Sequence, residues 1–180
     1  MTDKNPIASM DAKIDLVNEG KLSLGYGTIL HPKSTLIIDG CSLVIGEYNI
    51  IEENVTIKVC PFYNALLEQY ENKTIYIGNF NHFRIGSYLQ NTSVENNCLI
   101  DYRANLVDCS VESNCIVSPC VELNNKFIVP ENKIIFKDYS LRENINFNKE
   151  NHEKYIKELH ALTEKKLKND KNYLFLNING

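Results

Sequence analysis

The sequence predicts a mainly β protein, a single-stranded parallel β-helix of about six triangular coils with an α-helix after it. Three observations lead to this prediction. An apolar residue recurs at steps of six, the residue four places after it is usually small, and a helical apolar pattern follows the last repeat. Each repeat is one structural unit that buries its apolar side only by stacking on its neighbours, so this periodicity outweighs other fold signals.

The hexapeptide repeat begins at Leu24 and resumes after each interruption. Each hexad supplies one short strand and a corner, so the opening residue points to the axis of the coil and the residue after it points outward. Ile100 is thus expected inside and Asp101 outside. The opening residues are Leu24, Leu30, Leu36, Ile45, Ile51, Ile57, Ile77, Phe83, Leu89, Val94, Ile100, Leu106, Val111, Val117, Leu123, Val129 and Ile135. The small inward positions are Thr28, Ser34, Asn49, Val55, Asn81, Ser87, Cys98, Ala104, Cys115 and Val121.

The turns of the coil are expected at glycines, which accept backbone angles that other residues resist. Before the regular repeats, residues 7–12 with Ile14 or Leu16 are expected to form an irregular first coil. The glycines that suit tight corners are Gly25, Gly27, Gly46, Gly78 and Gly86.

One long interruption, at about residues 59–74, is expected to leave the coil as a projecting loop. Its side chains are too apolar for a purely solvated excursion. Either they pack back on the outer surface of the coils, or they contact a partner. The candidate contact residues are Phe62, Tyr63, Leu66 and Tyr70.

The repeat stops at Lys137, which divides the chain into a solenoid, residues 1–137, and a C-terminal part, residues 138–180. The latter comprises a polar connector, an amphipathic helix at about 149–168 and a tail. The helix is expected to cover a flat face or an open end of the solenoid, and Leu174 and Phe175 of the apolar tail are candidate contacts with a neighbour. The apolar stripe of the helix comprises Tyr155, Ile156, Leu159, Leu162 and Leu167.

Composition limits the classes of function. The net charge of the 180 residues is −4, and no basic stripe with interleaved aromatic residues indicates nucleic-acid binding. No segment approaches the roughly 18 apolar residues of a membrane span, and the N-terminus lacks the apolar run of a signal peptide, so we expect a cytoplasmic protein without membrane insertion. The cysteines contain no Cys-x-x-Cys pair; structural use is favoured over redox or metal binding.

Two enzyme classes use this architecture. A γ-class carbonic anhydrase needs three histidine ligands for zinc, one of them in a His-x4-His pair, but His31 and His82 stand alone on separate coils. His152 and His160 lie in the expected helix. A hexapeptide acyltransferase needs a histidine as general base, and His82, expected to point outward, is the candidate for that role or for a partner contact. The sequence thus favours a non-enzymatic protein without a catalytic, metal or cofactor site.

Three segments resemble the dynactin subunit 6 family. They are Gly27-Thr-Ile-Leu-His-Pro-Lys-Ser-Thr-Leu-Ile-Ile, Leu43-Val-Ile-Gly-Glu-Tyr-Asn-Ile-Ile-Glu-Glu-Asn and Val129-Pro-Glu-Asn-Lys-Ile-Ile-Phe. The order of coils, central loop, further coils and C-terminal helix is also similar, over about residues 7–142. This sequence departs from the family pattern in three places: the central loop, which is more apolar here, Lys137 and Arg142-Glu143.

This resemblance implies a left-handed β-helix and a non-catalytic structural or adaptor subunit of the dynactin complex. Its implied partners are dynactin subunit 5, other pointed-end subunits including an actin-related protein, and indirectly dynein. The implied role is support of dynein-driven transport on microtubules and of cargo attachment, in the cytoplasm and at the cytoskeleton.

Overall fold

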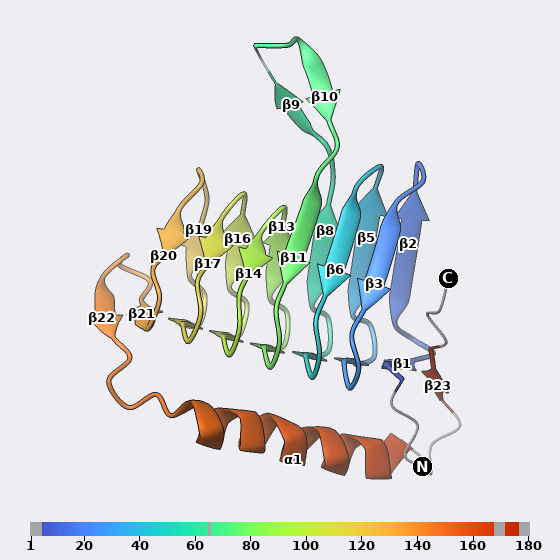
Figure 1. Ribbon diagram of the computed structural model, residues 1–180, viewed down its shortest axis with the longest axis vertical. Helices are drawn as coiled ribbons and strands as arrows, with labels where there is room; N and C mark the ends of the chain where they lie inside the picture. Colours follow the sequence, from blue (N-terminus) through green and yellow to red (C-terminus); the bar gives the residue numbers. More distant parts are fainter. Residues whose placement is uncertain (1–4, 65, 168–171, 177–180) are drawn as a thin grey trace.

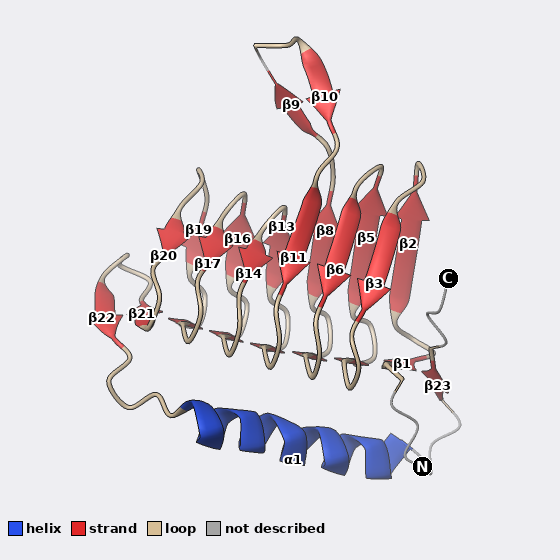
Figure 2. Cartoon of the chain, viewed as in Figure 1, coloured by secondary structure: helices blue, strands red, loops and turns tan. Residues whose placement is uncertain are grey.

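The computed structural model describes residues 5–64, 66–167 and 172–176. It confirms the predicted fold class, a parallel β-helix of about six turns with one C-terminal helix (Figure 1). Three sheets form the sides of a triangular prism, and the strands of each are short (Figure 2). We name the three sides the lower, far and near faces after their positions in Figure 1.

The lower face is a nine-stranded sheet. Its coil strands pair in parallel, whereas β22 and β23 add to its two ends antiparallel. In chain order the strands are β1 (Ile7–Ser9), β4 (Ile29–Leu30), β7 (Ile50–Ile51), β12 (His82–Phe83), β15 (Leu99–Ile100), β18 (Ile116–Val117), β21 (Lys133–Ile135), β22 (Leu141–Glu143) and β23 (Tyr173–Phe175).

The far and near faces each contain six parallel strands. The far face comprises β2 (Lys13–Val17), β5 (Thr35–Asp39), β8 (Thr56–Val59), β13 (Tyr88–Gln90), β16 (Asn105–Val107) and β19 (Glu122–Leu123). The near face comprises β3 (Lys21–Leu24), β6 (Ser42–Ile45), β11 (Thr74–Ile77), β14 (Ser93–Val94), β17 (Ser110–Val111) and β20 (Ile128–Val129).

The coil is left-handed. In Figure 1 the chain descends along the near face, crosses the lower face to the back and rises along the far face while it advances from right to left. Crossovers between parallel strands are right-handed in about 98% of cases, so this solenoid belongs to the exceptions.

The core fills the axis of the prism, as the hexad pattern predicts. None of the opening residues named above is more than 8% exposed, and Phe83 in the middle of the stack is fully buried. The small inward positions are buried as well. Two of them are asparagines that bridge neighbouring coils: Asn49 Nδ2 donates to the Gly78 carbonyl at 2.8 Å, and Asn81 Nδ2 donates to the Glu95 carbonyl at 2.7 Å. Their amides are therefore satisfied inside the core.

The corners confirm the expectation based on glycine only in part: Gly27 and Gly86 have positive φ, at 67° and 73°. Most residues in the left-handed region are not glycine, and they include Tyr48 at φ 52° and Phe80 at φ 58°. Gly46 and Gly78 have no positive φ; a Cβ on Gly46 would lie 2.2 Å from Asn79 Oδ1, and one on Gly78 would lie 2.5 Å from Asn96 Oδ1. These two glycines permit close approach of stacked coils rather than an unusual backbone angle.

The C-terminal part adds to the solenoid in three places. α1 (Lys149–Leu167) lies along the lower face, β22 pairs with β21, and β23 pairs with β1 (Figure 1). Opposite α1, the hairpin of β9 (Phe62–Asn64) and β10 (Gln69–Glu71) leaves the corner between the far and near faces. Within the described residues, α1 lacks the apolar character of a bilayer-spanning helix.

Candidate interaction site

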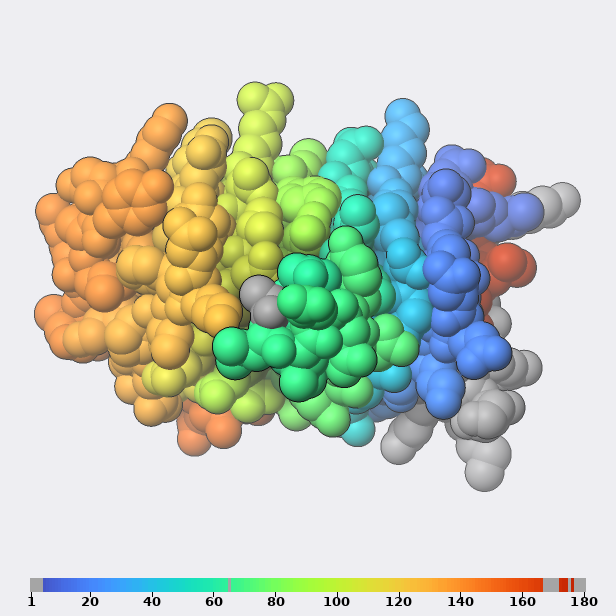
Figure 3. Space-filling view, turned by 90° about the horizontal axis from the view of Figure 1, so that it is seen from above, coloured from blue at the N-terminus to red at the C-terminus, as the bar shows by residue number. Residues whose placement is uncertain are grey.

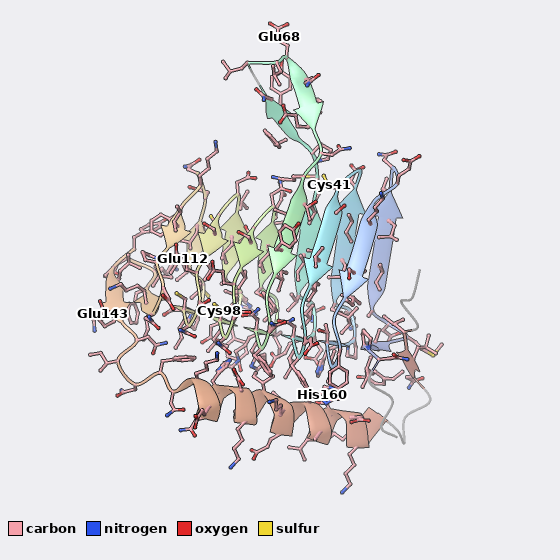
Figure 4. The ribbon with its side chains drawn as sticks, viewed as in Figure 1. Cys41, Glu68, Cys98, Glu112, Glu143 and His160 are labelled. Carbon is pink, nitrogen blue, oxygen red and sulfur yellow. The ribbon has the colours of Figure 1, made fainter. Side chains whose placement is uncertain are left out.

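The hairpin presents aromatic and aliphatic side chains to solvent. In its antiparallel register Tyr63 lies opposite Tyr70, and the two rings meet edge to face at 5.3 Å between centroids. Tyr63 is nevertheless 55% exposed, Tyr70 73% and Leu66 near the tip 94%. Figure 4 shows the tip, marked by Glu68, far from the coils. The alternative in which this segment packs back on the coils is therefore wrong.

The base of the hairpin is fixed to the coil below it. The Cys60 N–H donates to Asn91 Oδ1 at 3.0 Å. Lys73 Nζ lies 5.4 Å from the centroid of the Phe62 ring and 3.5 Å from Asp108 Oδ1. These contacts hold the beginning of β9 and the end of β10, so the exposed tyrosines stand at a defined position relative to the coils.

A groove of about 690 Å³ separates β9 from the corner loops of the following coils. Figure 3 shows the hairpin, in green, lying over the upper corner beside the yellow loops. The groove joins the half-exposed Phe62 and Tyr63 to Ile128, which is 56% exposed. Its lining is Phe62, Tyr63, Lys73, Asn91, Val107, Asp108, Cys109, Ser110, Asn124, Asn125, Lys126 and Ile128.

The lower face is apolar on its outer side too. Its outward residues stack in register, and all but one of those in the coils are aliphatic. α1 covers the N-terminal half of this row, where Ile29 and Ile50 are at most 1% exposed. The row consists of Ile7, Ile29, Ile50, His82, Leu99, Ile116 and Ile134. An aliphatic residue directly before the inward residue of every third hexad was the sequence signal for this covered face.

α1 packs through a stripe that matches the predicted one at Ile156 and at the half-buried Leu159 but differs from it elsewhere. Ile156 is fully buried and His160 is 8% exposed, whereas Tyr155 and Leu162 are 51% and 60% exposed. His160 rises from α1 toward the lower face (Figure 4). Its ring meets Tyr48 edge to face at 5.6 Å. His160 lies one helical turn after Ile156, so both side chains are on the same face of α1. A stripe chosen by hydrophobicity alone leaves out the histidine.

The amino-terminal half of α1 is held by a second histidine. His152 Nε2 donates to the Phe80 carbonyl at 2.8 Å. Lys157 Nζ lies 5.1 Å from the centroid of the Phe80 ring and 5.8 Å from that of Tyr48, which itself stacks on Phe80. The helix thus packs along the corner of the prism where Tyr48 and Phe80 lie, two aromatic residues whose backbones are in the left-handed region. The predicted stripe residue Leu167 has a side chain outside the described set.

His82 points outward from the coil, as its place before Phe83 predicts, but α1 covers it. It is 4% exposed, its Nε2 donates to Glu52 Oε1 at 2.6 Å, and its ring lies 6.3 Å from that of Tyr155. Burial tends to raise the pKa of the Glu52 carboxyl, but the bond from His82, together with the Ile85 N–H, holds that pKa below its usual value. A partner that leaves α1 in place cannot reach His82.

The same geometry argues against His82 as a catalytic base. A general base must lie within hydrogen-bonding reach of its acceptor substrate, but Nε2 of this imidazole is bonded to Glu52 and only 4% of the residue is exposed, toward a cavity of about 300 Å³ beside α1. Among the described residues, no three histidine, cysteine or acidic side chains are placed to bind one metal ion. Burial raises the pKa of the Cys98, Cys109 and Cys115 thiols, which keeps them protonated and unreactive.

From the two histidines of α1 we predict that the folded protein loses stability in mild acid. Burial lowers the pKa of His152, and the charge of His82 adds to this against the opposing effects of the Phe80 carbonyl and Glu153. Burial also lowers the pKa of His160, opposed by Glu164. In the unfolded chain both imidazoles titrate near pH 6.5, so below that value the unfolded state binds more protons than the folded state. Stability is complete above about pH 6.5 and falls below it, by at most about 1.4 kcal/mol per pH unit for each histidine.

Denaturant unfolding between pH 8 and 5 measures this effect. The variant His160→Phe should show a shallower fall, because one of the two groups no longer titrates. A free energy of unfolding that stays constant or rises from pH 7 to pH 5 would contradict the prediction.

Of the predicted contact residues, Phe62, Tyr63, Leu66 and Tyr70 come together on the hairpin. Leu174 lies in β23 and is 53% exposed, far from the hairpin along the prism (Figure 1). Phe175 pairs through its backbone with Ile7, and its side chain lies outside the described set. The predicted contact residues therefore lie on two separate surfaces, one on the hairpin and one at β23. His82 is buried and belongs to neither surface.

Searches with protein-family models gave no match. The chain is 32% identical over 127 residues to dynactin subunit 6 of Danio rerio, which covers 68% of this chain and 65% of that protein. It is 31% identical over 129 residues to dynactin subunit 6 of Xenopus tropicalis, covering 69% of this chain and 63% of that protein. The matched region therefore spans a little under two thirds of these relatives.

Among solved structures, a hexapeptide transferase family protein from Anaplasma phagocytophilum superposes with a TM-score of 0.66. The sequences are 15% identical, and the superposition covers 89% of this chain and 92% of that one. At this identity the likeness establishes a shared solenoid fold and leaves the chemistry open.

Proposed function

We propose, because this chain is a relative of dynactin subunit 6, that it is a non-catalytic structural and adaptor subunit of the dynactin complex. Its neighbours there would be dynactin subunit 5 and other pointed-end subunits, including an actin-related protein. Through them the chain would support dynein-driven transport on microtubules and cargo attachment, in the cytoplasm and at the cytoskeleton.

The observation that carries this proposal is the exposed hairpin. An isolated two-stranded hairpin is marginally stable in water, yet this one displays Tyr63, Tyr70 and Leu66. Exposed apolar side chains that gather in one place mark contact sites, and tyrosine is prominent among the residues that dominate binding energy. The fixed base of the hairpin and the adjoining groove would give a neighbouring subunit a preformed surface.

The covered lower face supports the non-catalytic part of the proposal. The candidate general base, His82, pairs with Glu52 beneath α1. The lower face, with its row of outward aliphatic residues, packs against α1. Docking is therefore assigned to the corner with the hairpin, which lies on the opposite side of the prism.

Affinity capture of the tagged full chain from native cytoplasm tests the function. Actin-related proteins and dynactin subunits should be recovered with it. A capture that yields the chain without any dynactin subunit would overturn the assignment.

The double variant Tyr63→Ser and Tyr70→Ser tests the surface. Each tyrosine is expected to contribute about 2 kcal/mol to docking, a factor of about thirty, so the double variant should weaken the affinity for the neighbouring subunit by about a thousandfold. The matched control is Tyr76→Ser with Tyr139→Ser, because these tyrosines are 61% and 57% exposed and belong to the coil strand β11 and to the loop before β22, not to the hairpin. Equal recovery with both double variants would exclude the hairpin, and unchanged melting temperatures would show that folding is intact.

A further inference from the structure

The N-terminal end of the prism leaves part of the core uncovered. In β2, Ile14 and Leu16 pair in register with Leu36 and Ile38 of the next coil, so their side chains point to the axis as well. Leu36 and Ile38 are fully buried, but Ile14 is half-buried and Leu16 is 53% exposed. Leu16 is thus a core residue by its orientation and a surface residue by its exposure.

The opposite end of the core is closed. The inward residues of the last coil, Leu123 and Val129, are at most 2% exposed, and Phe127 packs against the same core. Phe127 stands four places after the inward Leu123, where most other hexads carry a small residue. The uncovered core is therefore a feature of the N-terminal end and not of both ends of the coil.

The backbone of β2 has a free side at the same end. Within the part of the chain that the structure describes, β2 is the end strand of its sheet and pairs only with β5. The Lys13 N–H donates to the Ser34 carbonyl, on the β5 side, at 2.8 Å. Because the N–H and C=O groups of successive residues point to opposite sides of a strand, those of Ile14 and Leu16 point to the open end. Such a row of donors and acceptors is a template for a further strand.

One side of this end already carries an added strand. On the lower face, β23 pairs antiparallel with β1. Of the other two sides, β2 offers five residues and β3 four. The inward residues of β3 are also better covered, since Leu22 is half-buried and Leu24 is 8% exposed. The free side of β2 is thus the place where a further strand would cover most apolar surface.

The end is too small to hold a second copy of the chain. A triangle with sides of five extended residues, at about 3.3 Å each, has an area on the order of 120 Å². A stable dimer buries roughly 800 Å² on each partner. A single extended segment matches the size of the surface.

We propose that the free side of β2 binds one extended segment of a partner protein as a further parallel strand, with apolar residues beside Ile14 and Leu16. The orientation is parallel because every strand pair of the far face is parallel. On the outer side, Lys13 Nζ lies 2.8 Å from Asp15 Oδ2, and the two side chains are 66% and 32% exposed. An acidic residue beside Lys13 and a basic residue beside Asp15 would complement these charges. This surface is separate from the hairpin, and the inference does not depend on the proposed function.

The acetylated and amidated pentapeptide Glu-Val-Lys-Val-Thr is a probe with this pattern. Titrated into the full chain, it should shift the NMR amide signals of Ile14 and Leu16 saturably, with a dissociation constant of about 1 mM, and leave those of the hairpin unchanged. At a peptide concentration about ten times that constant, hydrogen exchange of the two amides should be about tenfold slower.

Three results would overturn the proposal. One is the absence of a saturable shift. Another is slow exchange of both amides in the chain alone, which would mean that the free side of β2 is already covered. The third is a shift of the same signals when the chain alone is concentrated, which would identify a second copy as the occupant.

Two N-methylated peptides test the backbone pairing. In a parallel strand beside β2, the N–H groups of the third and fifth peptide residues donate to the Ile14 and Leu16 carbonyls, and those of the second and fourth point away. Methylation of the third and fifth nitrogens should weaken binding about tenfold or more, and methylation of the second and fourth less than about twofold. Equal affinities would exclude strand addition, and the reverse order would overturn the parallel arrangement.

The variant Leu16→Ser tests the uncovered core residue. Leu16 is 53% exposed, so the fold should tolerate serine, but the peptide should bind about fivefold more weakly. Leu162→Ser is the matched control, because Leu162 is 60% exposed on α1. Equal affinities for the two variants, with melting temperatures that match, would refute the role of Leu16.

Discussion

Replacing Ile100 by lysine is expected to destabilise the fold by about 4 kcal/mol or more, because the ammonium group would be buried without a partner. Ile100 is fully buried in β15, where it lies in register between Phe83 and Val117 of the adjacent coils. A solenoid has no alternative core, so a charge at one level disrupts the stacking of both neighbours. Urea denaturation followed by circular dichroism measures the free energy of unfolding.

The matched control is Asn105→Lys, at an exposed outward position of β16. It should change stability by less than about 0.5 kcal/mol. Asp101, also outward, is not a neutral control: it accepts from Arg84 and from the Tyr102 N–H at 2.8 Å, so its removal should cost about 1 kcal/mol. Equal stabilities for Ile100→Lys and Asn105→Lys would mean that the inward register is wrong.

The coil and its register could be predicted because hexad periodicity is a local property of the sequence. Leu24, Phe83 and Ile135 belong to one pattern although more than a hundred residues of chain separate the first from the last. Because side chains alternate along a strand, the position of His82 directly before the inward Phe83 also predicted that His82 points outward. Whether an outward residue meets solvent depends on the segments that follow the coils. The aliphatic residues before every third opening residue mark the lower face as covered, but they do not identify α1 as the segment that covers it.

The predicted packed side of α1 was right at Ile156 but wrong at Tyr155 and Leu162, because hydrophobicity ranks leucine and tyrosine above histidine. The lower face offers a carbonyl at Phe80 and an aromatic edge at Tyr48, and both suit an imidazole. His152 and His160 therefore face inward while Leu162 faces water. Which side of a helix is buried depends on the surface that it packs against, and that surface exists only in the folded protein.

The hairpin and the tail show a second limit. Residues 59–74 were predicted to leave the coil, but cross-strand pairing of Tyr63 with Tyr70 depends on a turn that the sequence does not mark with Asn-Gly or Asp-Gly. Pairing of Leu174 with Ala8 joins opposite ends of the chain. Such a contact follows from the free edge of the first coil, and nothing in the tail itself specifies it.

Replacing Ile156 by aspartate is expected to release α1 from the lower face, with a local cost of about 3 kcal/mol or more. Ile156 of the 19-residue helix is fully buried, so the new carboxylate would be removed from water. An isolated helix of this length is marginal in water, so the released segment should lose helicity as well. Amide hydrogen exchange across residues 149–167 should accelerate by two orders of magnitude or so, a factor of about 100 for every 2.7 kcal/mol.

Leu162→Asp is the matched control, because Leu162 belongs to the same helix and is 60% exposed. Its exchange rates should stay close to those of the unmodified chain. Release of α1 also uncovers His82, whereas the hairpin on the opposite side of the prism should continue to recover the neighbouring subunit. If Ile156→Asp and Leu162→Asp showed the same slow exchange, burial of Ile156 could not be what holds α1, and the two imidazole contacts at Phe80 and Tyr48 would have to carry the docking themselves.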